Sequence, residues 1–209
     1  RTCAHFCVLS PEEKGKCGVR KNIKGKIYSL NYGKAAALNI DPIEKKPFFH
    51  FLPGSISLSF CGAGCSLSCK NCQNWDLSQG PKTTEEIEGG NVSPEKIVKT
   101  AKEHSSPSIS YTYTDPLAFL EYAIDTMKLA KKEKIKNCFV SHGFFSEDAL
   151  KAAIPYLDAI NIDIKSFSED FYKENCGARL QPVLNTAKIM KKANIWVEIT
   201  TLVIPTLSD

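Results

Sequence analysis

The sequence lacks the features that mark several whole classes of protein. It contains no run of about 18 consecutive apolar residues, which excludes a membrane-spanning helix. Its 27 basic and 23 acidic side chains leave a net charge of only +4, too small and scattered an excess to indicate a nucleic-acid-binding protein. With 43% hydrophobic and 24% charged residues and no internal repeat, the composition excludes collagen, coiled coil and disorder.

Signals for the start and the end of a complete chain are missing too. Arg1 is not an initiator methionine, no signal-peptide pattern follows it, and residues 205–209 read as a loop. We therefore expect the 209 residues to be an internal stretch of a longer chain. Their number corresponds to one domain and a remainder, at about 150 residues per domain.

Nine cysteines are the unusual feature of the composition. Their density is below that of a disulfide scaffold, and they are clustered in the sequence. The first 17 residues hold three, residues 61–72 hold four, and two stand alone, at Cys138 and Cys176. Four thiols within twelve residues, without a secretory signal, indicate a metal site in a reducing compartment rather than disulfides. We therefore expect a cytoplasmic protein.

Hydrophobic periodicity divides the chain into two parts. Residues 1–54 are rich in glycine, lysine and turns, with short strand-like pieces at 26–32 and 35–40 and an extended connector at 41–54. From residue 55 onward, five predicted strands alternate with helices, which indicates a parallel α/β sheet, open or barrel-like. The strands are 56–60, 109–114, 137–142, 158–165 and 195–203; the helices are 94–104, one that starts at Asp115-Pro116, 146–154 and 168–193.

Polar side chains recur on one face of the predicted strands. Strands buried on both faces usually read as continuous apolar runs, but here polar residues occupy every second position. This pattern predicts a sheet interior that holds water or a polar ligand, rather than a closed core of valine, isoleucine and leucine. The alternative is that this sheet face lies at the surface. The residues concerned are Ser57, Ser59, Ser110, Thr112, Thr114, Asn161, Asp163, Lys165, Trp196, Glu198 and Thr200.

A cysteine loop follows the first strand of this second part, with the sequence CGAGCSLSCKNCQNW at 61–75. The thiolates of Cys65, Cys69 and Cys72 can bind three corners of a four-iron cluster and leave one iron without a protein ligand. A vacant coordination position is where chemistry occurs. A zinc knuckle with Cys61 as its fourth ligand is the alternative, although zinc pairs usually come as C-x2-C twice, a dozen or more residues apart.

The chain resembles the radical S-adenosylmethionine (SAM) superfamily, whose signature is C-x3-C-x2-C after the first barrel strand. More narrowly, it resembles the radical SAM enzymes of the AmmeMemoRadiSam system, relatives of the pyruvate formate-lyase activating enzymes. Essentially the whole chain takes part in this resemblance. It is carried by GKCGVR at 15–20, DPIEKKPFFHFLPGS at 41–55, CKNCQNWDLSQ at 69–79, YTYTDP at 111–116, NIDIKSFSEDFYKENCG at 161–177 and VEITTLVIP at 197–205.

The resemblance implies a fold and an activity. The fold is a partial (β/α)6 barrel over residues 55–209, incomplete after about five strands, preceded by a small cysteine-containing segment at 1–54. A [4Fe–4S] cluster on the cysteine triad would bind SAM and cleave it reductively to a 5′-deoxyadenosyl radical, which abstracts hydrogen from a substrate. This implies an oxidoreductase supplied with electrons by a flavodoxin- or ferredoxin-like donor. Activating enzymes of this type act on a glycyl residue of a partner protein, so a protein substrate is one candidate.

The resemblance also implies positions that contact SAM. Tyr113, Thr114 and Asp115 stand where the superfamily has Gly-Gly-Glu, a segment that meets the SAM amino group. Asp163 and Lys165 match the Asp-x-Lys of the activating enzymes. Before the third cysteine, this chain has Asn71 where the superfamily commonly has an aromatic residue near the adenine. Trp75 is the nearest aromatic residue, which could substitute there or belong to the core.

A purely structural role stays possible for several of these residues. Asp115 could cap a helix before Pro116, Asp163 and Lys165 could form a structural ion pair, and His142 could be an ordinary strand-end histidine. Cys3, Cys7 and Cys17 could bind a second cluster or zinc, or pack as inert thiols. We interpret Cys61, Cys138 and Cys176 as structural and Phe48, Phe49, His50 and Phe51 as residues that clamp the connector. The alternative function is a zinc- or cluster-binding interaction module without turnover.

Overall fold

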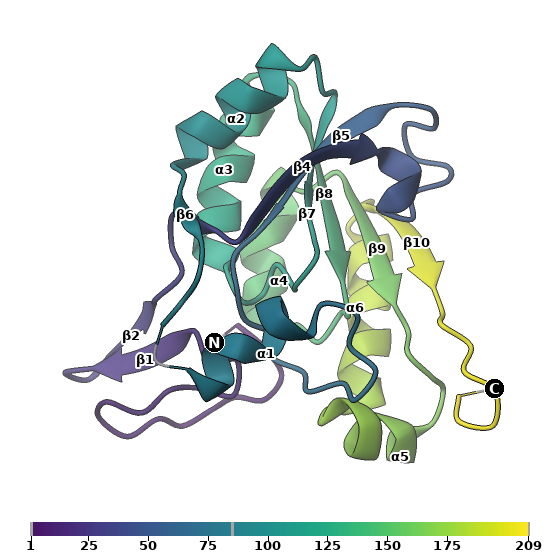
Figure 1. Ribbon diagram of the computed structural model, residues 1–209. Helices are drawn as coiled ribbons and strands as arrows, with labels where there is room; N and C mark the ends of the chain where they lie inside the picture. The colour runs from purple at the N-terminus through teal and green to yellow at the C-terminus, as the bar shows by residue number, and fades with distance from the viewer. Residues whose placement is uncertain (1, 85, 209) are drawn as a thin grey trace.

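A six-stranded sheet forms the centre of the molecule (Figure 1). The computed structural model describes residues 2–84 and 86–208; Arg1, Glu85 and Asp209 lie outside the described residues. The strand order is β10-β9-β8-β7-β5-β4, and all neighbours are parallel except β4, which is antiparallel to β5. The strands are β4 (Ala37–Pro42), β5 (Ile56–Cys61), β7 (Ser108–Tyr111), β8 (Lys136–Ser141), β9 (Ala159–Asp163) and β10 (Trp196–Thr200).

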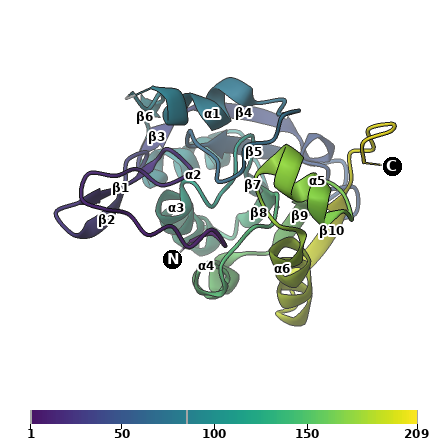
Figure 2. The same ribbon diagram turned by 90° about the horizontal axis from the view of Figure 1, so that it is seen from below.

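Four helices connect the parallel strands, as the alternation in the sequence predicts. They are α2 (Pro94–Glu103), α3 (Leu120–Lys132), α4 (Glu147–Ala153) and α6 (Leu180–Lys192), and Figure 2 shows α3, α4 and α6 following one another along one side of the sheet. Serine caps start two of them: Ser93 Oγ accepts from Lys96 N at 3.3 Å, and Ser146 Oγ accepts from Ala149 N at 3.2 Å. Within the described ranges, each helix is too short or too polar to span a bilayer.

Short elements complete the fold. A hairpin pairs β1 (Arg20–Ile23) with β2 (Lys26–Ser29), and β3 (Lys34–Ala35) pairs with β6 (Gly90–Asn91). A helix that the sequence analysis missed, α1 (Trp75–Thr83), follows the cysteine loop and contains Pro81. The remaining turns are η1 (Ile43–Lys45), η2 (Ile154–Tyr156), α5 (Glu169–Phe171) and the π-helical η3 (Tyr172–Cys176).

Several predicted boundaries are wrong. The helix expected from Asp115-Pro116 begins only at Leu120, because residues 116–119 form a turn first. The helix expected over 168–193 is broken after η3, where Gly177 adopts a left-handed φ of 63°. The strands β7, β9 and β10 end at Tyr111, Asp163 and Thr200, so Thr112, Thr114 and Lys165 lie just beyond the sheet.

The two faces of the sheet are filled differently. Against the helices, an aromatic cluster packs around Phe60, whose ring lies 5.1 Å from Tyr111 and 5.2 Å from Tyr122. On the other face, Ser57 and Ser110 are fully buried, with their hydroxyls 2.7 Å apart. The polar positions of β5 and β7 within the sheet therefore belong to the interior of the protein.

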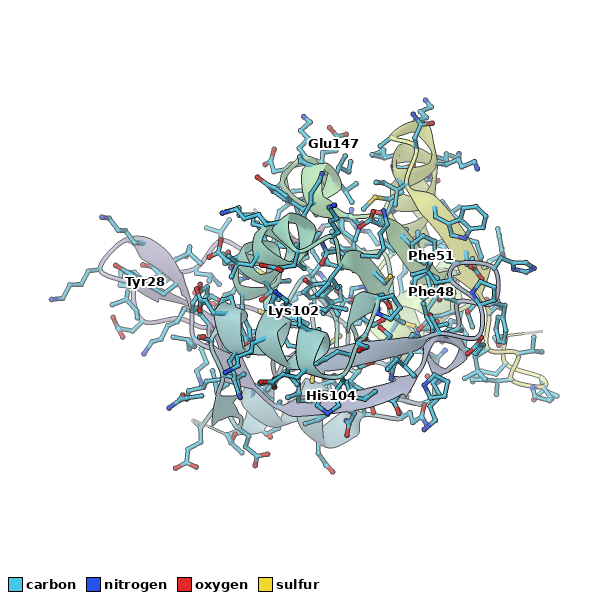
Figure 3. The ribbon with its side chains drawn as sticks, turned by 90° about the horizontal axis from the view of Figure 1, so that it is seen from above. Tyr28, Phe48, Phe51, Lys102, His104 and Glu147 are labelled. Carbon is cyan, nitrogen blue, oxygen red and sulfur yellow. The ribbon has the colours of Figure 1, made fainter. Side chains whose placement is uncertain are left out.

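The connector fills part of the polar face, at the N-terminal ends of the strands. Phe48 is fully buried in a small apolar cluster with Ile43, Cys138 and Ala159, and Asn161 Nδ2 donates to Pro47 O at 3.0 Å. Figure 3 shows Phe48 and Phe51 beside β10. The expectation that the aromatic residues clamp the connector therefore holds for Phe48, whereas Phe49 is 61% exposed.

Glu198 of β10 holds the connector in place. The sequence pattern had placed Glu198 in an interior that binds a polar ligand, and this expectation is wrong. Its carboxylate accepts the backbone N–H groups of Phe49, His50 and Phe51 at 2.9, 3.2 and 3.1 Å, and Trp196 Nε1 at 3.0 Å. Trp196 itself is 47% exposed and Thr200 lies at the end of the strand. Burial raises the pKa of Glu198, but these N–H donors outweigh it and hold the pKa below its ordinary value.

We expect Glu198→Ala to lower the free energy of unfolding by roughly 2–3 kcal/mol, because several N–H donors lose one charged acceptor. The depressed pKa adds a pH signature. The stabilisation is present above the unfolded-state pKa and disappears as pH falls through the folded-state pKa, so the wild-type melting temperature should fall more steeply below about pH 4.5 than that of Glu198→Gln.

Thermal unfolding between neutral and acidic pH checks this prediction. The matched control is Glu147→Gln in α4, whose side chain is 76% exposed and lies away from the connector (Figure 3). Equal acid sensitivity of the wild type and Glu198→Gln would contradict the assigned role.

Candidate functional site

A cavity of about 830 Å³ lies at the C-terminal ends of the parallel strands, the end at which ligands bind in such folds. Figure 2 views the molecule from this end. The cysteine loop forms one wall and β4 with the start of the connector forms another, while the segments after β7, β8 and β9 lie between them. The lining includes the sequence-predicted residues Cys65, Cys69, Cys72, Asn71, Tyr113, Thr114, Asp115, Asp163 and Lys165.

The three cysteines of the C-x3-C-x2-C motif all line this one cavity. Cys65 is buried, and Cys69 and Cys72 are half-buried. Cys61 is fully buried at the end of β5 and does not line the cavity. The structure thus brings together the three thiols expected to act as a set and separates the fourth from them.

Close packing explains the two glycines at the start of the cysteine loop, whose irregular part is residues 62–74 between β5 and α1. A Cβ on Gly62 would meet the Phe119 side chain at 2.9 Å. Gly64 adopts a φ of +100°, and a Cβ there would lie 2.6 Å from Val19 and 2.9 Å from the carbonyl oxygen of Cys17. No other residue type fits these positions without moving its neighbours.

Hydrogen bonds from several elements hold the rest of the cysteine loop. Lys82 Nζ donates to Leu67 O at 2.6 Å, and Ser68 N donates to Cys176 O at 2.9 Å. Beyond the sheet, Thr114 Oγ1 donates to Gly62 O at 2.7 Å, and Asn74 Nδ2 donates to Tyr113 O at 2.6 Å. The thiols therefore sit on a segment of irregular backbone that other elements fix in place.

A thiol partner, burial and two lysines act on the pKa values of the thiols. A hydrogen bond from the Cys176 thiol lowers the pKa of Cys69 to about 7, against the opposing effect of burial and with help from Lys165 and Lys82. Burial raises the pKa of Cys65, and the Asp115 carboxylate raises it further. Burial also lowers the pKa of Lys82, while the neighbouring cysteines raise it. Cationic side chains near a group of thiols favour the thiolate form that binds metal.

Asp163 and Lys165 form an ion pair on the cavity wall, with Lys165 Nζ 2.8 Å from Asp163 Oδ2. Their side chains are 34% and 24% exposed, so both remain in contact with the cavity. Burial disfavours the charge of Lys165, but the Asp163 carboxylate outweighs it and raises the lysine pKa. The ion pair considered in the sequence analysis is present. Both side chains remain partly exposed to the cavity.

A second polar cluster on the cavity wall was missed in the sequence analysis. Tyr113 Oη donates to Asp41 Oδ2 at 2.9 Å, Lys46 Nζ lies 2.9 Å from the same oxygen, and Asn39 Nδ2 donates to Tyr113 Oη at 3.0 Å. Lys46 is only 4% exposed, and its cation lowers the pKa of Asp41 to about 2. The polar residues at 39 and 41, two positions apart, were the signal in the sequence that could have indicated this cluster. The antiparallel pairing of β4 with β5, which brings them to the cavity, could not be read from the sequence.

Tyr113 holds an unusual backbone conformation in this cluster. Its φ is +62°, in the left-handed region that glycine adopts at no steric cost. The hydroxyl is anchored by Asp41 and Asn39, and Lys46 Nζ lies 4.4 Å from the ring centroid. These contacts stabilise a tyrosine where the superfamily pattern has glycine.

Asp115 is almost completely buried, and protein groups occupy both of its oxygens. Oδ1 accepts Leu117 N at 2.9 Å, which caps the turn before α3. Oδ2 accepts Ser141 Oγ at 2.8 Å and His142 N at 2.9 Å, and His142 Nε2 lies 3.1 Å away. Asp115 therefore caps a turn and not a helix, because α3 begins only at Leu120 with Phe119 as its N-cap, and Asp115 ties the segment after β7 to the segment after β8.

Three further residues that the sequence analysis considered, Asn71, Trp75 and His142, have different surroundings. Asn71 is exposed at the edge of the cavity. Trp75 is 52% exposed and lines a separate surface hollow beside α1, so it belongs neither to the core nor to the cavity lining. His142 is buried at the end of β8, where burial lowers its pKa despite the Asp115 carboxylate.

The chemistry of the donors decides whether an iron–sulfur cluster suits this site. Among the described residues, no three His, Cys, Asp or Glu side chains converge on a single metal position. Three thiols share the cavity wall, however, and Lys82 and Lys165 supply positive charge beside them. Cysteine thiolates are the usual ligands of iron–sulfur clusters, so the residues fit such a group.

We expect Asp115→Asn to lower the free energy of unfolding by about 2–4 kcal/mol, because an amide group cannot accept every hydrogen bond that the buried carboxylate accepts. Ser141→Ala removes one donor to Asp115 and the acceptor of Gly143 N, and should cost about 1–2 kcal/mol. Urea denaturation of both variants checks this prediction. A smaller effect for Asp115→Asn than for Ser141→Ala would show that the carboxylate does not hold the two segments together.

Comparison with known proteins agrees with the fold and the cysteine loop. The chain is 44% identical over 207 residues to the uncharacterized protein MJ0808 of Methanocaldococcus jannaschii, which covers 99% of this chain and 61% of that protein. It is 24% identical over 151 residues to the pyruvate formate-lyase 1-activating enzyme of Escherichia coli K12, covering 70% of this chain and 60% of that enzyme. The chain thus spans about 60% of the length of these relatives.

A solved structure supports the fold, and a family model shows the superfamily. SuiB of Streptococcus suis is similar in fold, with a TM-score of 0.53 at 15% identity over 78% of this chain and 36% of SuiB. The model of the radical SAM superfamily matches residues 60–209, which include the whole cysteine triad and all five parallel strands except the first residues of β5. The chain therefore belongs to the radical SAM superfamily, and its sheet is a partial radical SAM (β/α) fold.

Proposed function

We propose that this chain is the cluster- and SAM-binding core of a radical SAM enzyme of the activating-enzyme type, belonging to the AmmeMemoRadiSam system. One observation carries the proposal. The three thiols of the C-x3-C-x2-C motif and the Asp163–Lys165 pair line the same cavity, at the C-terminal ends of the parallel strands. Three thiols suited to a metal cluster and a charged pair suited to a polar ligand thus share one space.

Cys65, Cys69 and Cys72 would hold a [4Fe–4S] cluster in this proposal. When bound, the cluster and SAM supply the chemistry, a one-electron cleavage to a 5′-deoxyadenosyl radical that removes a hydrogen atom from a substrate. The contribution of the chain is to fix the thiols and to place positive charge beside them. Lys82 does both, since it donates to Leu67 O and Ser68 Oγ and lies close to the thiols.

The cavity wall beside the thiols would bind SAM. Lys165 and Asp163 present a cation and an anion to the cavity, which suits the carboxylate and the hydroxyl or amino groups of a polar ligand. Tyr113, Thr114 and Asn71 also line the cavity and complete the proposed SAM contacts. Asp115 would act as a positioning residue, because both of its oxygens already accept hydrogen bonds from the protein.

A glycyl residue of a partner protein is the proposed substrate class. The similarity to a pyruvate formate-lyase 1-activating enzyme supports this choice, together with a cavity of about 830 Å³ that is large enough for a peptide segment beside a cofactor. A flavodoxin- or ferredoxin-like protein is the proposed electron donor. Residence in the cytoplasm stays a prediction from the clustered thiols.

The continuous polar cavity favours an enzyme over a binding module. A zinc knuckle that only docks partners needs no ligand-sized space beside its metal. Here the charged residues Asp41, Lys46, Asp163 and Lys165 face such a space from two sides. Anaerobic reconstitution with iron and sulfide, followed by reduction in the presence of SAM and an assay for 5′-deoxyadenosine, tests the proposed activity. A reduced, cluster-loaded protein that forms no 5′-deoxyadenosine would refute it.

Substitution of single cysteines tests the ligand set. Replacement of Cys65, Cys69 or Cys72 by Ala should abolish the broad iron–sulfur absorbance and the SAM-dependent signal, because each variant lacks one of three ligands. Cys61→Ala should leave both largely intact, since Cys61 is buried at the end of β5, outside the cavity lining. Loss of the cluster in Cys61→Ala as complete as in the other variants would mean that the triad is wrongly chosen.

Lys165→Met tests the proposed SAM wall. We expect it to keep the cluster but to weaken SAM binding by roughly 1.5–3 kcal/mol, the value of a charge-assisted hydrogen bond. This corresponds to about 10- to 150-fold in the dissociation constant. Titration of SAM against the reduced cluster by electron paramagnetic resonance measures the change.

The matched control for Lys165→Met is Lys173→Met, because Lys173 is 61% exposed and only 4.0 Å from its own partner Asp170. The melting temperature without SAM should move little in both variants. Unchanged SAM affinity together with a large loss of stability in Lys165→Met would return the pair to a purely structural role.

A further inference from the structure

His142 is a buried side chain of the cavity wall that the proposed function does not use. It follows β8 directly, lines the cavity and is only 6% exposed. Its ring reaches two other segments, because Nε2 lies 3.1 Å from Asp115 Oδ2, after β7, and 3.2 Å from Ser66 Oγ, in the cysteine loop. One imidazole thus connects the segment after β7 with the residue next to Cys65.

The hydrogen bonds around the ring fix the position of its proton. Phe144 N donates to His142 Nδ1 at 3.1 Å, and a backbone N–H can only donate, so Nδ1 carries a lone pair. The proton of the ring is therefore on Nε2, where it is directed at the Asp115 carboxylate and the Ser66 hydroxyl. Gly143, with a φ of +73°, forms the tight turn that brings Phe144 N back to the ring. His142 thus acts as a hydrogen-bond donor toward both segments.

Two histidines from different parts of the chain hold Ser66. His142 Nε2 donates to its hydroxyl at 3.2 Å, and His5 Nε2 donates to its carbonyl oxygen at 2.8 Å. On the other side of Cys65, Gly64 N donates to a carbonyl oxygen of α1 at 2.8 Å. Cys65 therefore lies between two anchored residues, and His142 is the anchor that also lines the cavity.

We propose that His142 is a positioning residue of the candidate site: its Nε2–H couples Asp115 to the cysteine loop and thereby fixes the loop at Ser66, next to the first thiol of the triad. The Asp115 carboxylate also accepts His142 N at 2.9 Å, so it holds both the backbone and the ring of this residue. A shift of either segment has to break a buried hydrogen bond. The role of Cys65 as a cluster ligand rests on the proposed function, whereas the coupling itself involves protein groups only.

Two amide substitutions distinguish the two nitrogens of the ring. His142→Gln keeps a donor near the position of Nε2, whereas the shorter side chain of His142→Asn reaches only the position of Nδ1. The measurement is the rate at which iodoacetamide alkylates Cys65 in the metal-free protein, followed by mass spectrometry of its peptide. We expect His142→Asn and His142→Ala to accelerate this reaction at least fivefold and His142→Gln to stay within twofold of the wild type.

Ser66→Ala tests the same hydrogen bond without altering the buried histidine, in case a substitution of His142 prevents folding. It removes the acceptor and should accelerate the alkylation of Cys65 to a similar extent as His142→Asn, and the two together should add little, because both break one bond. The matched control is His104→Ala. His104 is an exposed histidine at the end of α2 (Figure 3), outside the cavity lining, so this variant should react at the wild-type rate.

A second measurement extends the test to the cluster-loaded protein. His142→Asn should keep the electron paramagnetic resonance signal of the reduced cluster but raise the SAM dissociation constant at least threefold, because the loop and the wall are no longer held together, and His142→Gln should lie closer to the wild type. A wild-type protein without a cluster or a response to SAM would refute the proposed function, and the metal-free alkylation rates would still decide the role of His142.

Three results would overturn the proposal. The first is an unchanged alkylation rate of Cys65 in both His142→Ala and His142→Asn. The second is an equal acceleration in His142→Gln and His142→Asn, which would show that Nε2 does not matter. The third is an equal acceleration at Cys138, a fully buried thiol of β8, because that would indicate general unfolding in place of a local role.

Discussion

The irregular backbone of the cysteine loop is the constraint on which the rest of the structure depends. A segment without helix or strand must present three thiols to one space, and its own hydrogen bonds cannot fix it. Its N–H and C=O groups are paired with distant elements instead: Lys82 of α1, the hydroxyl of Thr114 after β7 and the carbonyl of Cys176 after α5. Gly62 and Gly64 let Phe119 and Val19 pack against the loop backbone more closely than any side chain at these positions would allow. The fold around the loop thus replaces the missing secondary structure.

The connector closes the cavity at its inner end. An open parallel sheet leaves a concave face along the full length of its strands, but Phe48 and its apolar neighbours fill the half near the strand N-termini. Glu198 fixes this filling from β10 and Asn161 fixes it from β9. Lys46 and Pro47 of the connector then line the cavity itself. The same segment therefore acts as core at one end and as binding wall at the other.

Sequence periodicity predicted which side chains lie on the polar face of the sheet. It could not predict contacts that form only when strands distant in the sequence pair with each other. Alternation along single strands placed Thr112, Asp163 and Lys165 on the polar face, and all three line the cavity. The cluster of Asp41, Lys46 and Tyr113 was invisible because it forms only when β4 pairs antiparallel to β5 and a tyrosine takes a left-handed φ. Helix α1 was missed because Gly80 and Pro81 argue locally against a helix. Trp75 was considered from its residue type alone, and it lies neither in the core nor in the cavity lining.

The charges on the cavity wall fit a ligand that carries both signs. Lys46 is paired with Asp41, Lys165 with Asp163, and Asp115 with N–H and O–H donors, so no buried charge on the wall stands alone. An anion or a cation bound singly would have to break one of these pairs and leave a charge without its partner in a partly dry site, at a cost of several kcal/mol. A ligand with adjacent amino and carboxylate groups avoids this cost. Its amino group can pair with the protein carboxylate while its carboxylate pairs with the protein lysine, so that no charge is left without a partner. The half-exposed pair of Asp163 and Lys165 is the place on the wall where such an exchange requires the least desolvation.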